Sequence, residues 1–330
     1  MKNGLGRFEF YLAALQDLLT RATQERNPAL WLYSNDARTP IFMLEGLSKL
    51  YAGLHNSKKF NRLKEDFKSL EDGLGAIDYY DCFAKEFSTK PNIPVEITNY
   101  IQAQTREKIQ RLNDVLISRK WIGENAERID KIRKKLGEAD WMKDQKEIKA
   151  IAGFYKESIK IIIDFFKSCN GSFTEIETQV HSLRRKLRWL SIYPRALQGA
   201  IQLTDNNFAD DAVQKYLTDD IRNSPFNKMP DAGNNHYFLM LEKNYFLALS
   251  WMIASLGKLK DNGLRILIIA EALQLIKGID QEDAIRETMT ILGPEQPDLQ
   301  KILSDAYITC DTYFKEQHLD KLLSAITVVD

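Results

Sequence analysis

The sequence is poor in cysteine, histidine, glycine and proline. Its 330 residues include three cysteines, four histidines, 16 glycines and nine prolines. Cys82, Cys169 and Cys310 lie far apart and form no CxxC pair, which argues against a disulfide framework and a cysteine-rich zinc site. We expect them to be buried thiols in a reducing compartment. The scarcity of glycine and proline argues against a β-sandwich or barrel, because such folds need a turn after every short strand.

The sequence motifs of common enzyme classes are absent as well. There is no GxGxxG or GxxxxGK[ST] loop for nucleotides, no HExxH zinc motif and no GxSxG nucleophile turn. None of the four histidines follows a glutamate by three positions, so the Glu-x-x-His pair of di-iron bundles is missing. We therefore expect no enzyme activity, no catalytic residues, no metal site and no cofactor.

Long uncharged apolar runs are lacking too. A membrane-spanning helix needs about 18 or more apolar residues, and the best candidate, residues 238–256, contains Glu242 and Lys243. The first 19 residues show no uncharged apolar core before a cleavage site, which a secretory signal would have. We expect a cytoplasmic protein with no membrane partner.

Helical periodicity is what the sequence does contain, along almost its whole length. The three- and four-residue spacing of a bundle helix is found at Phe60, Leu63, Phe67, Leu70, Leu74 and Ile77. The same spacing recurs from Phe173 to Leu190, and no segment alternates steadily with a period of two. The sequence therefore predicts an all-α fold.

A helix boundary is predicted near the middle of the chain. Asn170-Gly171 can end a helix, because glycine adopts the left-handed conformation that follows a C-cap. Ser172 to Glu175 fits a capping box, which predicts that the next helix begins at Ser172. We expect two tandem helical bundles, an N-terminal half at 1–170 and a C-terminal half at 171–330. The two halves could be separate bundles that arose by duplication, or they could form one continuous unit.

Charge is balanced over the chain but unevenly distributed. There are 46 basic and 46 acidic residues in total. Residues 1–204 contain 34 basic and 26 acidic residues, whereas residues 205–330 contain 12 and 20. Such asymmetry can indicate a basic functional face, or charges that balance on a folded surface.

One segment, residues 180–190, concentrates basic side chains on a single predicted helix. His181, Arg184 and Arg188 follow i, i+3 and i+7, so they form a stripe beside the core-facing residues. Arg185 and Lys186 broaden this stripe, and Arg195 follows Pro194, which should kink or end the helix.

Two explanations fit this stripe. Like charges on adjacent turns repel, and a bound anion would offset the repulsion. Arginine suits phosphate because two of its donors can meet two oxygens. Alternatively, acidic residues pair with the stripe internally, as Glu177 could with His181 four positions later.

The segment resembles the signature helix of CHAD domains, the conserved histidine α-helical domains. Their pattern of His-x-x-Arg followed by further Arg and Leu is matched by His181, Leu183, Arg184, Leu187 and Arg188. Leu74-Gly75 and Leu256-Gly257, each followed by an aspartate, resemble a second recurrent element of that family. The resemblance implies two related helical bundles in tandem and binding of inorganic polyphosphate through a basic surface. It implies anion contacts at His181, Arg184 and Arg188, with Arg185, Lys186 and Arg195 as further candidates.

The first half departs from the family pattern. If Leu47 and Leu50 match Leu187 and Leu190, then Ile41, Leu44 and Ser48 replace His181, Arg184 and Arg188, and Lys49 is the only basic residue of the predicted helix 40–54. The sequence pI of about 6.9 also differs from that of a strong polyanion binder. A basic stripe at Arg128, Lys131 and Lys135 could rebuild the lost site, or could be a solvated face balanced by Glu124, Glu127 and Asp130.

The sequence thus favours a divergent CHAD-like protein that binds a polyanion, inorganic polyphosphate above all, without catalysis. One alternative is a helical scaffold for protein partners, which exposed aromatic residues around Trp121, Trp141 or Tyr193 would favour. Another is an all-α enzyme without a recognisable motif. Nucleic acid is a less favoured partner, because no reading helix or base-stacking motif is present.

Overall fold

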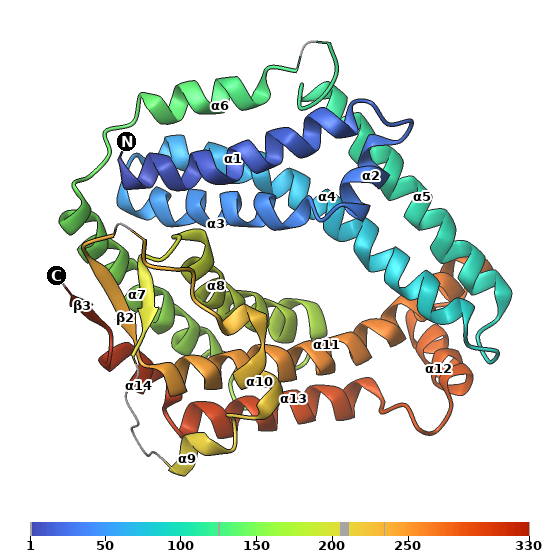
Figure 1. Cartoon of the computed structure of the whole chain (residues 1–330). Coiled ribbons are helices and arrows are strands. Elements are labelled where there is room, and N and C mark those ends of the chain that lie inside the picture. The colour runs from blue at the N-terminus through green and yellow to red at the C-terminus, as the bar shows by residue number, and fades with distance from the viewer. Residues whose placement is uncertain (1, 125, 205–210, 234, 330) are drawn as a thin grey trace. The chain divides into compact units, whose positions relative to one another are not determined.

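The computed structural model describes residues 2–124, 126–204, 211–233 and 235–329 (Figure 1). Within these ranges the protein is all-α with one small sheet, which confirms the predicted fold class. The chain forms two compact units: unit 1 comprises Met1–Met142 and Ile269–Ala284, and unit 2 comprises Lys143–Ile268 and Ile285–Asp330. This division differs from the predicted joint at residue 170, because the helix before that joint packs within unit 2.

Unit 1 is built around a pair of long helices. Its helices are α1 (Asn3–Ala22), α2 (Pro28–Ser34), α3 (Arg38–Leu54), α4 (Ser57–Ser88), α5 (Val95–Ser118) and α6 (Arg128–Gly137). α4 packs against α3 and α5, while α1 packs against α3 and α6. The stripe from Phe60 to Ile77 is buried along α4, as its spacing predicts.

Unit 2 contains α7 (Asp144–Lys167), the π-helix η1 (Ile176–His181), α8 (Ser182–Ala196), α9 (Asp211–Gln214), α10 (Asp219–Asn223), the 3₁₀ turn η2 (Pro225–Asn227), α13 (Leu299–Lys315) and α14 (His318–Ser324). Two further helices, α11 (Lys243–Lys277) and α12 (Gln281–Leu292), contribute residues to both units. α7 packs against α8, and the buried Tyr155 hydroxyl donates to the Leu190 carbonyl over 2.8 Å.

A three-stranded sheet in unit 2 was not expected from the sequence. β2 (Phe238–Leu241) pairs in parallel with β1 (Ile201–Leu203) and antiparallel with β3 (Thr327–Val329). The strands are only three or four residues long, too short for a period-two pattern to be recognised. Leu239 and Leu241 are buried, so one face of the sheet joins the core of unit 2.

The predicted helix start at Ser172 is wrong. Asn170 and Gly171 have positive φ angles and follow the end of α7, as predicted, but residues 172–175 are not helical. The backbone amides of Thr174 and Glu175 donate to the side-chain oxygen of Gln179, at 2.6 and 3.1 Å. A glutamine inside the helix thus does what the serine was expected to do, so the helix begins later, at Ile176.

The turn that begins this helix is wide. Residues 176–181 form η1, in which the backbone hydrogen bonds join residues five positions apart instead of four, and α8 continues directly from it. Ile176 lies so close to Gly263 of α11 that a Cβ on Gly263 would come within 2.7 Å of its Cδ1. α8 ends at Ala196, two residues after Pro194, consistent with the expected effect of proline.

Two of the three cysteines lie where they were expected. Cys169 and Cys310 are buried, but Cys82 is exposed, and its thiol donates to the Asp78 carboxylate over 3.4 Å. Among the described residues, no helix has the length and apolarity to cross a membrane.

Candidate functional site

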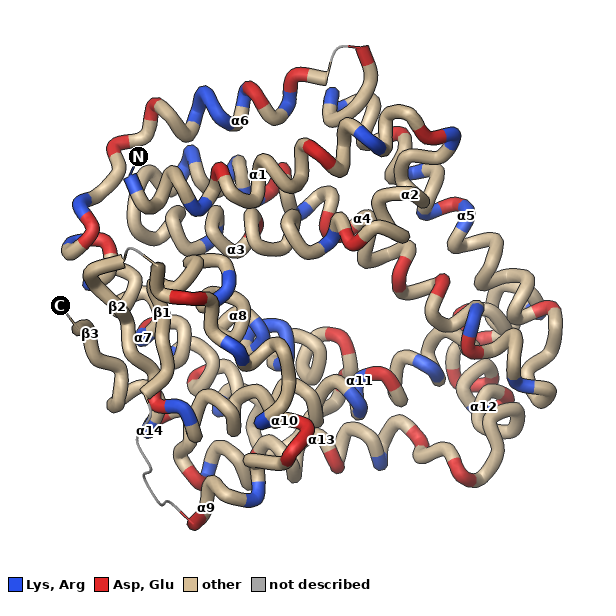
Figure 2. The backbone as a smooth tube through the Cα atoms, viewed as in Figure 1, with Lys and Arg blue, Asp and Glu red and all other residues tan. Residues whose placement is uncertain are grey.

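The basic residues of α8 do not act as one stripe. Figure 2 marks the Lys and Arg positions along this helix. Leu183, Leu187 and Leu190 are buried, so the helix presents its basic side chains on the two flanks of this apolar face. All six predicted anion contacts are half-buried: His181, Arg184, Arg185, Lys186, Arg188 and Arg195.

Arg184 turns towards α11. Its Nε donates to the main-chain carbonyl of Ile253 over 3.1 Å. Its guanidinium covers Gly257, where an added Cβ would lie 3.1 Å from Nε and 3.3 Å from Nη2. The two motifs that the sequence singled out, the basic helix and Leu256-Gly257, therefore meet at this contact.

The Arg184 guanidinium is a partly buried charge that forms no ion pair with a described residue. Among the described residues, no carboxylate lies within ion-pair distance of it, and Ile253 provides its single hydrogen bond. Burial lowers the pKa of Arg184, and the charge of the nearby Asp261 partly opposes this. The group stays protonated, because guanidinium does not lose its proton in proteins.

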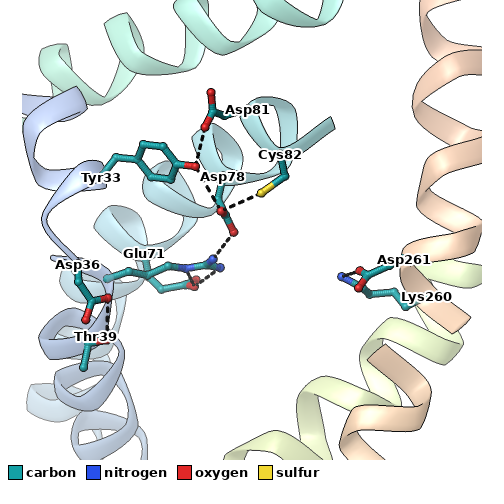
Figure 3. A network of polar contacts seen from close by, with 10 residues as sticks. Tyr33, Asp36, Thr39, Glu71, Asp78, Asp81, Cys82, Lys260 and Asp261 are labelled. Atoms are coloured by element: carbon teal, nitrogen blue, oxygen red, sulfur yellow. Dashed lines mark hydrogen bonds and ion pairs between the residues drawn. The ribbon is translucent and has the colours of Figure 1, made fainter. Parts of the chain in front are cut away.

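Acidic residues near Arg184 are engaged elsewhere. Asp261 forms an ion pair with Lys260 at 2.7 Å, which Figure 3 shows. His181 Nδ1 lies 2.8 Å from Glu177 Oε2. This hydrogen bond lowers the pKa of Glu177, and Lys260 adds to the effect. The expected internal pairing therefore holds for His181 but not for Arg184.

The remaining candidates divide between the two flanks. Lys186 turns the other way, and its Nζ lies 5.0 Å from the ring centroid of Phe165 in α7. Arg195 lies at the C-terminal end of α8, with its Cζ 5.9 Å from the ring centroid of Phe226. Helical phase places Arg188 one turn after Arg184 on the same flank. Arg185 forms no ion pair with a described residue. We call His181, Arg184, Arg185 and Arg188 the α8 basic face.

Unit 1 contains the same contact between an arginine and a helix glycine. A Cβ added to Gly75 of α4 would lie 3.0 Å from Nη2 of Arg38, the first residue of α3. Arg38 donates from Nε and Nη2 to Glu71, at 2.9 and 2.8 Å, and from Nη1 to Asp78 at 2.8 Å. Here the guanidinium is held between the carboxylates of Glu71 and Asp78, both of which are labelled in Figure 3.

This contact gives a second way to match the two halves. The sequence comparison placed Leu44 opposite Arg184, whereas the glycine contact places Arg38 there. The new register also pairs the buried Ala37, Ile41 and Leu44 with Leu183, Leu187 and Leu190. Arg38 was missed because it precedes the predicted helix start at Pro40. The available signal was Gly75, since a glycine inside a helix often marks a close neighbour.

A tyrosine and a cysteine extend the acidic cluster of unit 1. The Tyr33 hydroxyl donates to Asp81 over 2.8 Å, and burial together with Asp81 raises the pKa of Tyr33. Partial desolvation of its sulfur and the neighbouring Asp78 raise the pKa of the largely exposed Cys82 thiol to about 11. At this contact unit 1 thus has two carboxylates around its arginine, whereas no carboxylate of a described residue forms an ion pair with Arg184 in unit 2.

The basic residues of α6 are also divided by the structure. Lys131 pairs with Glu127, and Arg128 pairs with Asp66 of α4. Lys135 is exposed and forms no ion pair with a described residue.

In the described part of the chain, no group of three or more His, Cys, Asp or Glu side chains could hold a metal ion.

Comparison with known proteins adds no relative. No protein-family model matches the chain, and no curated protein or solved structure matches it significantly. The resemblance to CHAD domains therefore stays a prediction that rests on the residues described above.

Proposed function

We propose that the α8 basic face binds a polyanion, inorganic polyphosphate above all, and that this binding involves no catalysis. The observation that carries the proposal is the half-buried Arg184 guanidinium, which has no carboxylate partner among the described residues. A charge removed from water is costly unless an opposite charge or hydrogen bonds compensate for it. A phosphate oxygen at Arg184 would supply both.

The geometry leaves donors for such an oxygen. Arg184 uses Nε for the Ile253 carbonyl, and its two Nη groups form no hydrogen bond with described residues. Two Nη donors in one plane suit two phosphate oxygens. Arg185 and Arg188 on the same helix would contact further phosphates of an extended chain, since several charges are needed for useful affinity in water.

His181 has a different role in this proposal. Its hydrogen bond with Glu177 fixes the ring at the start of the basic face. The carboxylate opposes anion binding at that end, so we place the main contacts at Arg184 and beyond. His181 is therefore not one of the main anion contacts, although the resemblance to CHAD domains implied that it is.

Calorimetric titration with long-chain polyphosphate tests the proposal. We expect binding that weakens steeply with salt, because released counterions drive it. The double variant Arg184→Gln/Arg185→Gln should bind at least about tenfold more weakly, as expected for loss of charge-assisted hydrogen bonds. Measurements at low and moderate salt would establish both effects.

A charge-matched control is available on α7. Lys156 and Lys160 form no ion pair with described residues, so Lys156→Gln/Lys160→Gln removes two charges from unit 2 and leaves the side chains of α8 unchanged. Equal losses in both variants, or binding insensitive to salt, would contradict the proposal. Single-stranded RNA titrated in parallel separates polyphosphate binding from general affinity for phosphate chains.

The alternative of a protein scaffold gains no support from the residues named for it. Trp121, Trp141 and Tyr193 are 2%, 8% and 1% exposed, so their rings are part of the core. An aromatic docking surface at these positions would need exposed rings.

A further inference from the structure

A pocket of about 590 Å³ opens on unit 1 between the first turns of α4 and helix α6. Its charged lining residues are Lys58, Arg62, Glu65, Asp66, Arg128 and Lys135. Four of these are basic and two are acidic, so the pocket carries net positive charge. Its lining contains no residue of the α8 basic face, which belongs to unit 2.

Both carboxylates of the pocket are already compensated. Asp66 pairs with Arg128. Glu65 lies 2.9 Å from Lys64, and this hydrogen bond lowers the pKa of Glu65. Three cations remain without an ion-pair partner among the described residues: Lys58, Arg62 and Lys135.

The pocket walls are held together by their own contacts. Lys59 Nζ of α4 donates to the Lys135 carbonyl of α6 over 3.0 Å. Arg128 Cζ lies 5.7 Å from the ring centroid of Trp121, which is 2% exposed. This stacking and the Asp66 pair fix the Arg128 guanidinium. Arg62 and Lys135 therefore line a pocket whose two walls are joined by these contacts.

We propose that this pocket binds a compact multivalent phosphate group, of the size of a di- or triphosphate. Two or three negative charges in a small volume would interact with all three of these cations at once. Linked phosphates provide these charges, whereas each carboxylate provides only one. The pocket volume falls within the range of about 300–1,000 Å³ that is usual for small-molecule sites, and Arg62 can bind phosphate oxygens in pairs.

The inference stands independently of the proposed function and is tested in a protein from whose α8 basic face two of the three arginines have been removed. Inorganic tripolyphosphate is titrated calorimetrically into Arg184→Gln/Arg185→Gln at low salt. We expect one site per chain, and we expect the additional changes Arg62→Gln/Lys135→Gln to weaken it at least about tenfold. Both residues are exposed, so the added changes should leave the fold intact.

Two exposed basic residues of unit 1 provide the matched control. Arg119 and Lys134 lie outside the pocket lining and form no ion pair with described residues. Arg119→Gln/Lys134→Gln should bind tripolyphosphate as tightly as the protein without these two changes. An equal loss in this control would mean general charge attraction and would overturn the inference, as would the absence of tripolyphosphate binding.

Three further ligands define the chemical class. Citrate that binds as tightly as tripolyphosphate would overturn the preference for phosphate. ATP that binds as tightly as or more tightly than tripolyphosphate would support the site with a nucleotide as its source. ATP that binds much more weakly would support it with an inorganic source. Orthophosphate should bind weakly, because it carries fewer charges.

The experiments can contradict the proposal for the α8 basic face and the proposal for the unit 1 pocket independently of each other. Loss of long-chain polyphosphate binding only in the α8 variant would uphold the proposed function and say nothing against the pocket. Tripolyphosphate binding that survives the α8 changes but not the pocket changes would uphold the pocket alone.

Discussion

Each of the two units contains a contact between an arginine and a helix glycine, but the residues around the two arginines differ in charge. Arg38 covers Gly75 in unit 1, and Arg184 covers Gly257 in unit 2. Four residues before the glycine stands Glu71 in one unit and Ile253 in the other. Three residues after it, Asp78 corresponds to Lys260.

The difference shows that packing and chemistry are set by different residues. The glycine lets the guanidinium approach the helix backbone in both units. The residues one turn to either side of it then decide whether the charge is balanced within the protein. In unit 1 two carboxylates balance it, and in unit 2 no carboxylate of a described residue forms an ion pair with it.

The largest expected effect comes from making the same substitution at both arginines. Arg38→Met leaves Glu71, which is 5% exposed, as a buried carboxylate without its partner. We expect it to lower the free energy of unfolding by about 2 kcal/mol, less than for a fully buried pair because Arg38 is partly exposed. Arg184→Met breaks no ion pair and should cost less than about 1 kcal/mol. Urea denaturation of the two variants makes the comparison, and equal losses would contradict it.

An intermediate effect is expected when the acidic position of unit 1 is copied into unit 2. Ile253→Glu places a carboxylate four residues before Gly257, where it can pair with Arg184 as Glu71 pairs with Arg38. Affinity for polyphosphate should then fall about tenfold, equivalent to about 1.4 kcal/mol. Calorimetric titration measures this change.

Two controls separate pairing from general repulsion. Ile253→Gln has the same shape without the charge and should bind normally. Ala254→Glu places the same charge at the exposed neighbouring position and should have a smaller effect. The comparison fails if all three variants lose affinity equally.

The smallest expected effect concerns the glycines themselves. Alanine stabilises a helix interior by up to about 1 kcal/mol relative to glycine. Gly153→Ala in α7 should show this gain, because nothing lies within 4 Å of the added Cβ. Gly257→Ala should gain somewhat less, since Arg184 has one hydrogen bond and can shift. Gly75→Ala should gain least, because two carboxylates hold Arg38 in place. Thermal unfolding midpoints rank the three variants, and a Gly75→Ala midpoint as high as that of Gly153→Ala would contradict the account.

The sequence predicted those features that depend on local periodicity. The stripe of α4, the end of α7 at Asn170-Gly171 and the core-facing leucines of α8 all lie as expected, because apolar spacing and glycine conformation act within a few turns. The separation of the basic side chains from the buried leucines along α8 was predicted for the same reason.

Local periodicity could not predict which residues, distant in the sequence, form hydrogen bonds and ion pairs with each other. The capping box at Ser172 failed because Gln179, five residues after Thr174, reached the same amides. The pairing of Arg38 with Glu71 and Asp78 joins residues 33 and 40 positions apart. The pocket joins Arg62 of α4 to Lys135 of α6, so the periodicity of α6 alone indicated only part of its lining.

The position of Arg184, on which the function proposed for α8 depends, is set by the number of residues in the wide turn from Ile176 to His181. Losing one residue there would restore an ordinary α-helix and rotate Ile176 by about 100° relative to Arg184. Either Ile176 would leave Gly263, or Arg184 would leave Gly257. During evolution this segment can therefore change in composition far more easily than in length, and a descendant with a one-residue deletion would lose one of the two glycine contacts.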